Sequence, residues 1–213
     1  SVRAVLELCW KLPVKEDSNQ SVITQQMVIY ANNPRIDFQT EVDWFENHTL
    51  LKVAFAVDIR TNKATYEVQF GHIERPTHRN TSWDMAKFEV CAHRFADLGE
   101  FDYGVALLND CKYGYDAHGD VIRLSCIKSA QYPDETADIG RHYFTYSLLP
   151  HRTSFQEAGV VQSAAEINNP LIVKAITASS GSKPANAFMF KSSNPSVIID
   201  TIKPAEDGSG TIV

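Results

Sequence analysis

The sequence of 213 residues predicts an all-β protein, a large antiparallel β-sandwich with few or no helices. Three observations favour this fold class. Apolar and polar residues alternate through several segments, turn residues separate these segments at short intervals, and no long window shows the 3.6-residue apolar spacing of a helix. At this length a single domain over residues 1–213 is large enough to bury a sizeable core.

Residues 36–44 show the alternation most clearly, with Ile36, Phe38, Val42 and Trp44 on one side and mainly polar residues between them. Successive side chains of a strand point to opposite faces, so this segment is predicted to be a strand with one buried face. The same reasoning predicts strands at 2–10, 22–30, 51–59 and 64–70.

In residues 64–70 the pattern places Tyr66, Val68 and Phe70 inward and Glu67 and Gln69 outward.

Shorter apolar runs predict strands at 87–91, 103–108, 121–125, 143–149, 188–191 and 197–202. One short helix or helical turn is predicted at 154–161, where Ser154 is a candidate cap and Glu157 follows three residues later. A mobile loop is expected at 179–184 because Ser and Gly predominate there. Both ends of the chain resemble interrupted strands, so we expect the domain to be truncated at both ends.

Composition excludes several classes of protein. The net charge of −6, with acidic and basic residues interspersed, argues against nucleic acid or an anionic membrane as partner. The apolar runs are far shorter than the ~20 residues of a membrane span. The four cysteines contain no C-x-x-C pair, and the first residues do not resemble a signal peptide. We therefore expect free, mostly buried thiols and a cytoplasmic protein.

No local motif predicts a catalytic residue or a metal site. His118-Gly-Asp120 is the one short candidate for metal ligands, but Asp, Gly and polar neighbours are also typical of a hairpin turn, which we favour. The other histidines show no H-E-x-x-H spacing, and the ten glycines form no phosphate-binding loop.

Residues 71–84 stand out as a candidate binding loop that concentrates charged, imidazole and indole side chains. Its candidate site residues are Glu74, Arg75, His78, Arg79 and Trp83. Aromatic rings stack on the apolar faces of sugars, and charged groups bind sugar hydroxyls, so this composition suits a carbohydrate. The alternative is a polar crossover loop held by ion pairs, with Trp83 anchored in the core.

Several blocks of the sequence, in this order, resemble the C-terminal β region of glycoside hydrolase family 38, of the cytosolic and bacterial type of α-mannosidase. The resemblance covers the whole chain and is carried by residues 35–44, 48–55, 66–71, 74–81, 104–114, 118–120, 123–125, 132–134, 140–142 and 144–146.

The resemblance implies a galactose-mutarotase-like supersandwich that belongs to a much longer, zinc-dependent, retaining α-mannosidase acting on terminal α-mannose residues of glycans. In that family the zinc ion and the Asp nucleophile belong to an N-terminal barrel. We therefore expect no catalytic residue, no metal ligand and no cofactor in this chain, which alone would be inactive. Its expected role is to supply scaffold and residues at the rim of the active-site cleft.

By position, the resemblance adds Asp110 and Lys112 to the rim candidates, and a second rim with Lys128, Asp134 and Arg141. The implied partners are a mannose-containing oligosaccharide and the enzyme's own catalytic barrel. Two alternatives stay open: a stand-alone carbohydrate-binding module and a mutarotase-like sugar enzyme. The latter requires a histidine and a carboxylate that face each other across the concave sheet.

Overall fold

The computed structural model describes residues 2–14, 19–177, 181–182, 184, 186–194 and 196–213. The chain forms two compact units, Ser1–Leu171 and Ile172–Val213. Strands predominate and every strand pair is antiparallel, which confirms the predicted fold class. The predicted extent of one domain over residues 1–213 stays a prediction.

The first unit is built on an eight-stranded sheet in the order β1-β2-β3-β12-β9-β8-β5-β6. Its register follows the predicted alternation, since Val42 and Trp44 of β3 are fully buried while Gln39 is exposed. The strands are β1 (Arg3–Lys11), β2 (Val22–Tyr30), β3 (Asn33–Trp44), β5 (Lys63–Val68), β6 (Gly71–Pro76), β8 (Phe95–Gly99), β9 (Tyr103–Asn109) and β12 (Gly140–Arg152).

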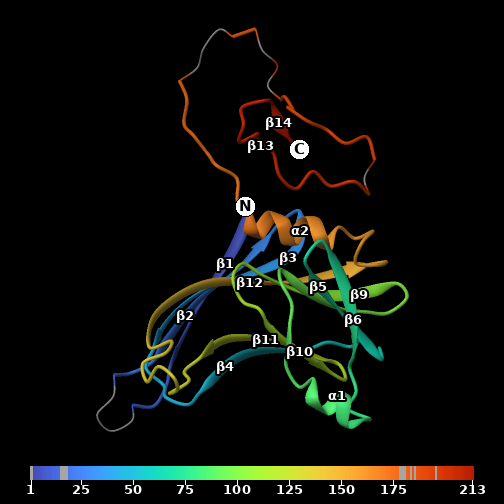
Figure 1. Cartoon of the computed structure of the whole chain (residues 1–213). Helices are drawn as coiled ribbons and strands as arrows, with labels where there is room; N and C mark the ends of the chain where they lie inside the picture. Colours follow the sequence, from blue (N-terminus) through green and yellow to red (C-terminus); the bar gives the residue numbers. More distant parts are fainter. Residues whose placement is uncertain (1, 15–18, 178–180, 183, 185, 195) are drawn as a thin grey trace. The chain divides into compact units, whose positions relative to one another are not determined.

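A four-stranded sheet packs on one face of the large sheet, as Figure 1 shows. Its order is β4-β11-β10-β7, with β4 (Leu50–Ala56), β7 (Val90–Cys91), β10 (Gly114–His118) and β11 (Val121–Lys128). The main core lies between the sheets, where Tyr66 and Leu107 of the large sheet belong to the same buried cluster as Tyr115 and Leu124 of the small one. The molecule is therefore a sandwich, as predicted.

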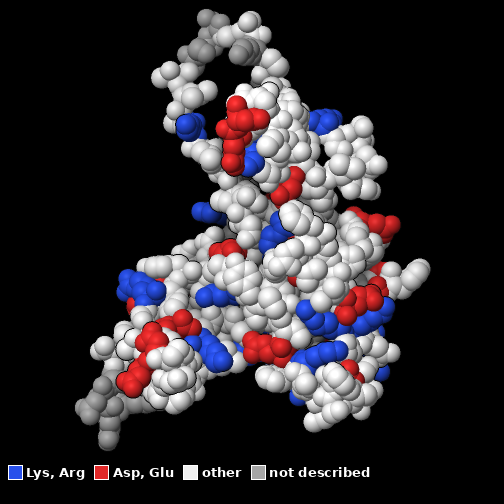
Figure 2. Space-filling model, in the orientation of Figure 1, with Lys and Arg blue, Asp and Glu red and all other residues white. Residues whose placement is uncertain are grey.

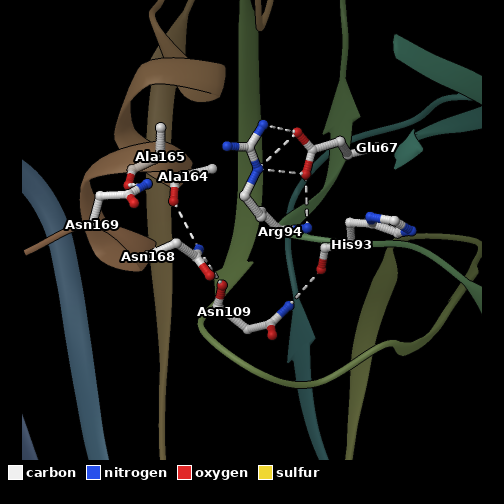
Figure 3. Close-up of polar contacts among 8 residues, drawn as sticks. All are labelled: Glu67, His93, Arg94, Asn109, Ala164, Ala165, Asn168 and Asn169. Atoms are coloured by element: carbon white, nitrogen blue, oxygen red, sulfur yellow. Dashed lines mark hydrogen bonds and ion pairs between the residues drawn. The ribbon is translucent and has the colours of Figure 1, made fainter. Parts of the chain in front are cut away.

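Helix α2 (Val160–Asn168) covers the opposite face of the large sheet (Figure 1). Its buried residues Val160 and Ala164 belong to a second apolar cluster with Leu108. At its C-terminal end, the Asn168 side chain donates a hydrogen bond of 3.0 Å to the carbonyl of Asn109, which fixes the helix on strand β9 (Figure 3).

One predicted element was confirmed as a turn, and another was wrong in extent. Of the short helix or helical turn predicted at 154–161, residues 155–159 form a turn in which the amide of Glu157 donates to the Ser154 hydroxyl at 3.3 Å, and helix α2 begins at Val160. Residues 71–76, predicted as loop, form β6, and Phe70 is fully exposed at the turn before it, at a φ of 54°.

In the second unit, the described residues form a small hairpin of β13 (Lys203–Pro204) and β14 (Thr211–Ile212). The strands predicted at 188–191 and 197–202 are absent among the described residues. Phe188 and Val197 are largely exposed, so their side chains supply no buried face to hold a strand. The predicted mobile loop, residues 179–184, includes residues outside the described part of the chain.

The cysteines are all free, as predicted, but the expectation of mostly buried thiols was wrong. Cys126 is buried in the main core, whereas Cys9, Cys91 and Cys111 are exposed. Within the described residues, no helix has both the length and the apolar character needed to span a membrane.

Candidate functional site

Thr77, at the end of β6, joins three loops at one end of the small sheet. Its amide donates to the carbonyl of Asn62 at 3.1 Å, and its hydroxyl donates to the carbonyl of Thr61 at 2.5 Å. Its own carbonyl accepts the amide of Gly119 at 2.9 Å and lies 3.0 Å from Nδ1 of His118. This buried residue therefore holds the 58–62 loop, the 77–80 segment and the β10–β11 hairpin together.

The short helix α1 (Ser82–Ala86) follows the 77–80 segment and was not predicted. A capping box stabilises its N-terminal end: the Thr81 hydroxyl accepts a hydrogen bond of 3.1 Å from the amide of Asp84, and the Asp84 carboxylate accepts one of 3.2 Å from the amide of Thr81. The Thr81 hydroxyl also donates to the Asp84 carboxylate at 2.8 Å. The hydrogen bonds that this carboxylate accepts from the hydroxyl and the amide of Thr81 hold the pKa of Asp84 below its usual range. The Thr-x-x-Asp spacing was the available signal in the sequence.

An open polar hollow of about 730 Å³ lies between the three loops. Both basic and acidic side chains line it, together with Ile59, which is buried. We call it the α1 hollow; its lining residues are Asp58, Ile59, Arg60, Thr61, Asn62, Thr77, His78, Arg79, Asn80, His118, Gly119 and Asp120.

Two of the predicted site residues, His78 and Arg79, line the α1 hollow. The imidazole Nδ1 of His78 lies 3.6 Å from the Asp84 carboxylate, so His78 connects the hollow to α1. Trp83 is 80% exposed, which contradicts the alternative that it is anchored in the core. Trp83 does not line the α1 hollow; it belongs to α1, the helix that His78 connects to the hollow.

Glu74 and Arg75 do not line the α1 hollow. Both belong to strand β6, which ends before the hollow, and their side chains point to opposite faces of the large sheet. Glu74 forms an exposed ion pair with Lys63 at 2.6 Å. The Arg75 guanidinium lies 4.7 Å from the centre of the Tyr66 ring, and burial lowers the pKa of Arg75. The prediction of one loop failed here because β6 continues through residue 76.

Asp110 and Lys112 lie at the other end of β10, away from the hairpin that borders the hollow. Asp110 accepts the amide of Thr145 at 2.9 Å, and Lys112 Nζ lies 4.7 Å from the centre of the Phe144 ring. Both contacts join the β9–β10 loop to strand β12. The structure thus separates these two candidates from the α1 hollow.

Arg141 also lies away from the hollow, since β12 pairs it with Asp43 of β3. Its guanidinium forms a two-pronged hydrogen bond with that carboxylate at 2.7 and 3.0 Å, which lowers the pKa of Asp43. Asp134 accepts hydrogen bonds from Thr136, and Lys128 lies at the end of β11 opposite to the hairpin. The second rim is therefore a separate region.

His118-Gly-Asp120 forms the β10–β11 turn, as predicted, with Gly119 at a φ of 60°. Nδ1 of the His118 ring lies 3.0 Å from the carbonyl of Thr77. In the described part of the chain, no group of three or more His, Cys, Asp or Glu residues could hold a metal ion. These residues do not fit a zinc site.

One histidine and one carboxylate do meet on the large sheet, as the mutarotase-like alternative requires. Nε2 of His151 lies 2.8 Å from Oδ1 of Asp97, and both residues are buried. Because the two groups bond to each other directly, no sugar ring fits between them. This geometry does not favour an enzyme that holds its substrate between an acid and a base.

Residues 3–136 match the sequence family described as "Glycosyl hydrolases family 38 C-terminal domain". The chain belongs to this family. As a family 38 C-terminal domain, it is 49% identical over 189 residues to human Alpha-mannosidase 2C1, and 48% identical over 197 residues to Alpha-mannosidase G of Dictyostelium discoideum. These alignments cover 89% and 92% of the chain, respectively.

The chain spans only 18% of the length of either relative. Among solved structures, it is similar to an α-mannosidase from Enterococcus faecalis V583, with a TM-score of 0.65 and 17% identity over 71% of this chain and 18% of that one. The latter similarity supports the fold of a family 38 C-terminal domain.

Proposed function

We propose that the chain is the C-terminal β domain of a larger cytoplasmic, zinc-dependent, retaining α-mannosidase that hydrolyses terminal α-mannose residues of glycans. The observation that carries this proposal is the 48–49% identity to two α-mannosidases across about nine-tenths of the chain. Residue identity at this level extends over both sheets, so it concerns the whole sandwich rather than one motif. The domain acts with the rest of the enzyme, its catalytic barrel.

In this proposal the α1 hollow contributes to the rim that contacts the glycan. Its polar groups come from three loops that Thr77 fixes relative to one another, which provides the rigid arrangement that recognition of a sugar needs. Trp83, on α1, adds an exposed aromatic surface in the same 71–84 segment as His78 and Arg79. Figure 2 shows acidic and basic side chains interspersed over the visible face, a distribution that suits a neutral, hydroxyl-rich partner.

The proposal places the zinc ion and the nucleophile outside this chain. The test is to assay the purified 213-residue chain and the complete enzyme side by side on an aryl α-mannoside with added zinc. We expect turnover only from the complete enzyme, together with bound zinc detected by metal analysis. Robust turnover by the chain alone would show that it contains the catalytic groups.

The rim role is tested in the complete enzyme with Arg79→Ala. Loss of a charged hydrogen bond at an accessible site predicts a rise in KM of about tenfold with little change in kcat. Lys11→Ala is the matched control, because this exposed cationic residue lies on β1, outside the α1 hollow. Equal KM values for both variants would remove the α1 hollow from the rim.

The alternative of a stand-alone carbohydrate-binding module makes a distinct prediction for the isolated chain. Saturable shifts of the Asn80 and Gly119 amides on titration with mannobiose, followed by NMR, would favour independent binding at the α1 hollow. No shift at millimolar mannobiose would leave the domain dependent on its barrel for recognition.

A further inference from the structure

A second hollow, of about 260 Å³, lies on the other face of the large sheet. Asp97 and Thr65 form part of it, together with residues 153–156, which precede α2. Asp97 is two residues from Phe95, whose ring packs in the α2-side cluster, so Asp97 points to the α2 side as well. Phe155 packs 5.7 Å from the Phe95 ring, which fixes the 153–156 wall. We call this the Asp97 pocket.

The position of Asp97 is fixed by His151 across an intervening strand. His151 pairs with Gly104 of β9, and its ring passes over that glycine to reach Asp97 on β8. A Cβ atom at position 104 would lie 2.5 Å from Nε2 of His151, so only glycine leaves room for the ring. Three adjacent strands therefore hold one carboxylate in a single orientation.

This arrangement leaves the second oxygen of Asp97 without a partner. Only Oδ1 receives a hydrogen bond within the described residues, although Asp97 is only 4% exposed. Oδ2 lies 3.3 Å from a Cβ built on Gly99, which is itself a lining residue of the pocket. Oδ2 is not among the side-chain atoms that are fully buried without a partner, so it is accessible from the pocket. A carboxylate oxygen in this position can accept a hydrogen bond from a donor outside the chain.

The charges around the pocket determine which donor fits. Three carboxylates line the pocket, those of Glu74, Asp97 and Glu100, against one lysine, Lys63. Lys63 pairs with Glu74 at 2.6 Å, and Glu100 accepts the amide of Arg60 at 2.5 Å, so negative charge predominates around the pocket. This charge repels phosphates and carboxylates. The His72 ring meets Phe155 edge-on at 5.0 Å and adds an aromatic surface. A neutral molecule rich in hydroxyl groups satisfies both the acceptor and the ring.

We propose that the Asp97 pocket binds a neutral monosaccharide or polyol, with Oδ2 of Asp97 accepting a ligand hydroxyl and His151 acting as the positioning residue for that carboxylate. The volume of about 260 Å³ lies just below the ~300–1,000 Å³ of drug-sized ligand sites, so it takes one sugar unit rather than an oligosaccharide. The site is distinct from the α1 hollow and does not depend on the proposed rim function.

The test is an NMR titration of the 213-residue chain with mannose, glucose and a sugar phosphate. We expect saturable shifts of the Gly99 amide and the His72 ring with a neutral sugar at millimolar concentrations, and weaker shifts with the sugar phosphate. Shifts confined to Asn80 and Gly119 would assign binding to the α1 hollow and overturn this proposal. Tighter binding of the sugar phosphate would overturn the neutral ligand class.

Asp97→Asn tests the carboxylate directly, since it keeps the size of the side chain, removes the negative charge and replaces one acceptor oxygen by an amide group that only donates. We expect the affinity for the neutral sugar to fall about tenfold, as for loss of a charge-assisted hydrogen bond. Asp43→Asn is the matched control, because Asp43 lies on the same sheet but outside the pocket. Unchanged affinity in a folded Asp97→Asn variant would contradict the role of Asp97. If the variant does not fold, the titration of the wild-type chain still tests whether the pocket binds a neutral sugar.

Discussion

The carboxylate of Glu67 and the guanidinium of Arg94 form a two-pronged pair, with both Glu67 oxygens 3.0 Å from Nε of Arg94 (Figure 3). The backbone amide of Arg94 also donates to this carboxylate at 2.7 Å. Glu67 is only 5% exposed, so replacing its carboxylate by a neutral group breaks an ion pair that is buried on the acidic side. We expect Glu67→Gln to lower the free energy of unfolding by roughly 3 kcal/mol, the lower end for a broken buried pair because Arg94 is partly exposed.

Urea denaturation followed by tryptophan fluorescence measures this change. Glu41→Gln is the control, since the Glu41 side chain is 43% exposed and its pair with Arg141, at 3.4 Å, is a surface ion pair. Its loss is expected to cost less than ~1 kcal/mol. If both variants lose the same stability, the Glu67 pair has no special weight in the fold.

Two tryptophans are predicted to contribute very differently to the stability of the fold. Trp44 is 1% exposed and its Nε1 donates to the Ser129 hydroxyl at 2.7 Å, whereas Trp83 is 80% exposed. Trp44→Ala should therefore cost roughly 3–5 kcal/mol, and Trp83→Ala should stay within about 0.5 kcal/mol of the wild type. Thermal unfolding of both variants decides this, and a large loss for Trp83→Ala would indicate that the indole packs against the fold.

The alternation of apolar and polar residues predicted the strands, because every second side chain of a strand points to the buried face of its sheet. β2 spans the predicted range, and Val42 and Trp44 of β3 are buried as expected. The rule failed at Glu67, which was assigned to the solvent side. Burial of a carboxylate depends on a cation from a distant segment, here Arg94, 27 residues further along the chain, and a local pattern cannot contain that partner.

The candidate site was predicted only in part, for a related reason. His78 and Arg79 were found because their residue types are unusual in one short segment, and both line the α1 hollow. Thr77 and Asn80 are ordinary polar residues, and only the meeting of three loops gives them a role. Asp97 and His151 are 54 residues apart, so their contact depends on the strand order.

The His151–Asp97 pair predicts a pH dependence of stability. Burial lowers the pKa of His151, but the hydrogen bond and the charge of Asp97, with the carbonyls of Arg152 and Thr153, outweigh burial and raise the pKa above its ordinary value of 6.5. A raised pKa in the folded state stabilises the fold fully below pH 6.5. This contribution is lost as pH rises through the folded value.

Asp97→Asn removes the charge that raises the pKa of His151. The free energy of unfolding of the wild type is expected to fall as the pH rises above 6.5, and the part of this fall that is due to His151 should be absent in the variant. Other titrating groups act on both proteins alike. The pH titration of the His151 ring protons by NMR provides the direct measurement. A ring that titrates at or below the ordinary histidine value in the wild type would contradict this prediction.

The four cysteines predict an order of reaction with iodoacetamide, because the thiolate is the reactive form and must be accessible. Cys9 and Cys91 are exposed and should react first. Cys111 is exposed too, but loss of water around its thiol and the hydrogen bond and charge of Asp110 raise its pKa to about 11, so it should react more slowly.

Cys126 is 4% exposed, and burial raises its pKa to about 12, so it should react only when the sandwich opens. Mass spectrometry of timed digests measures all four rates in one sample, and labelling in denaturant provides the control in which the four thiols react alike. If Cys126 reacted as fast as Cys9 in the native protein, the two sheets could not be packed together around it, because its sulfur lies in the core between them.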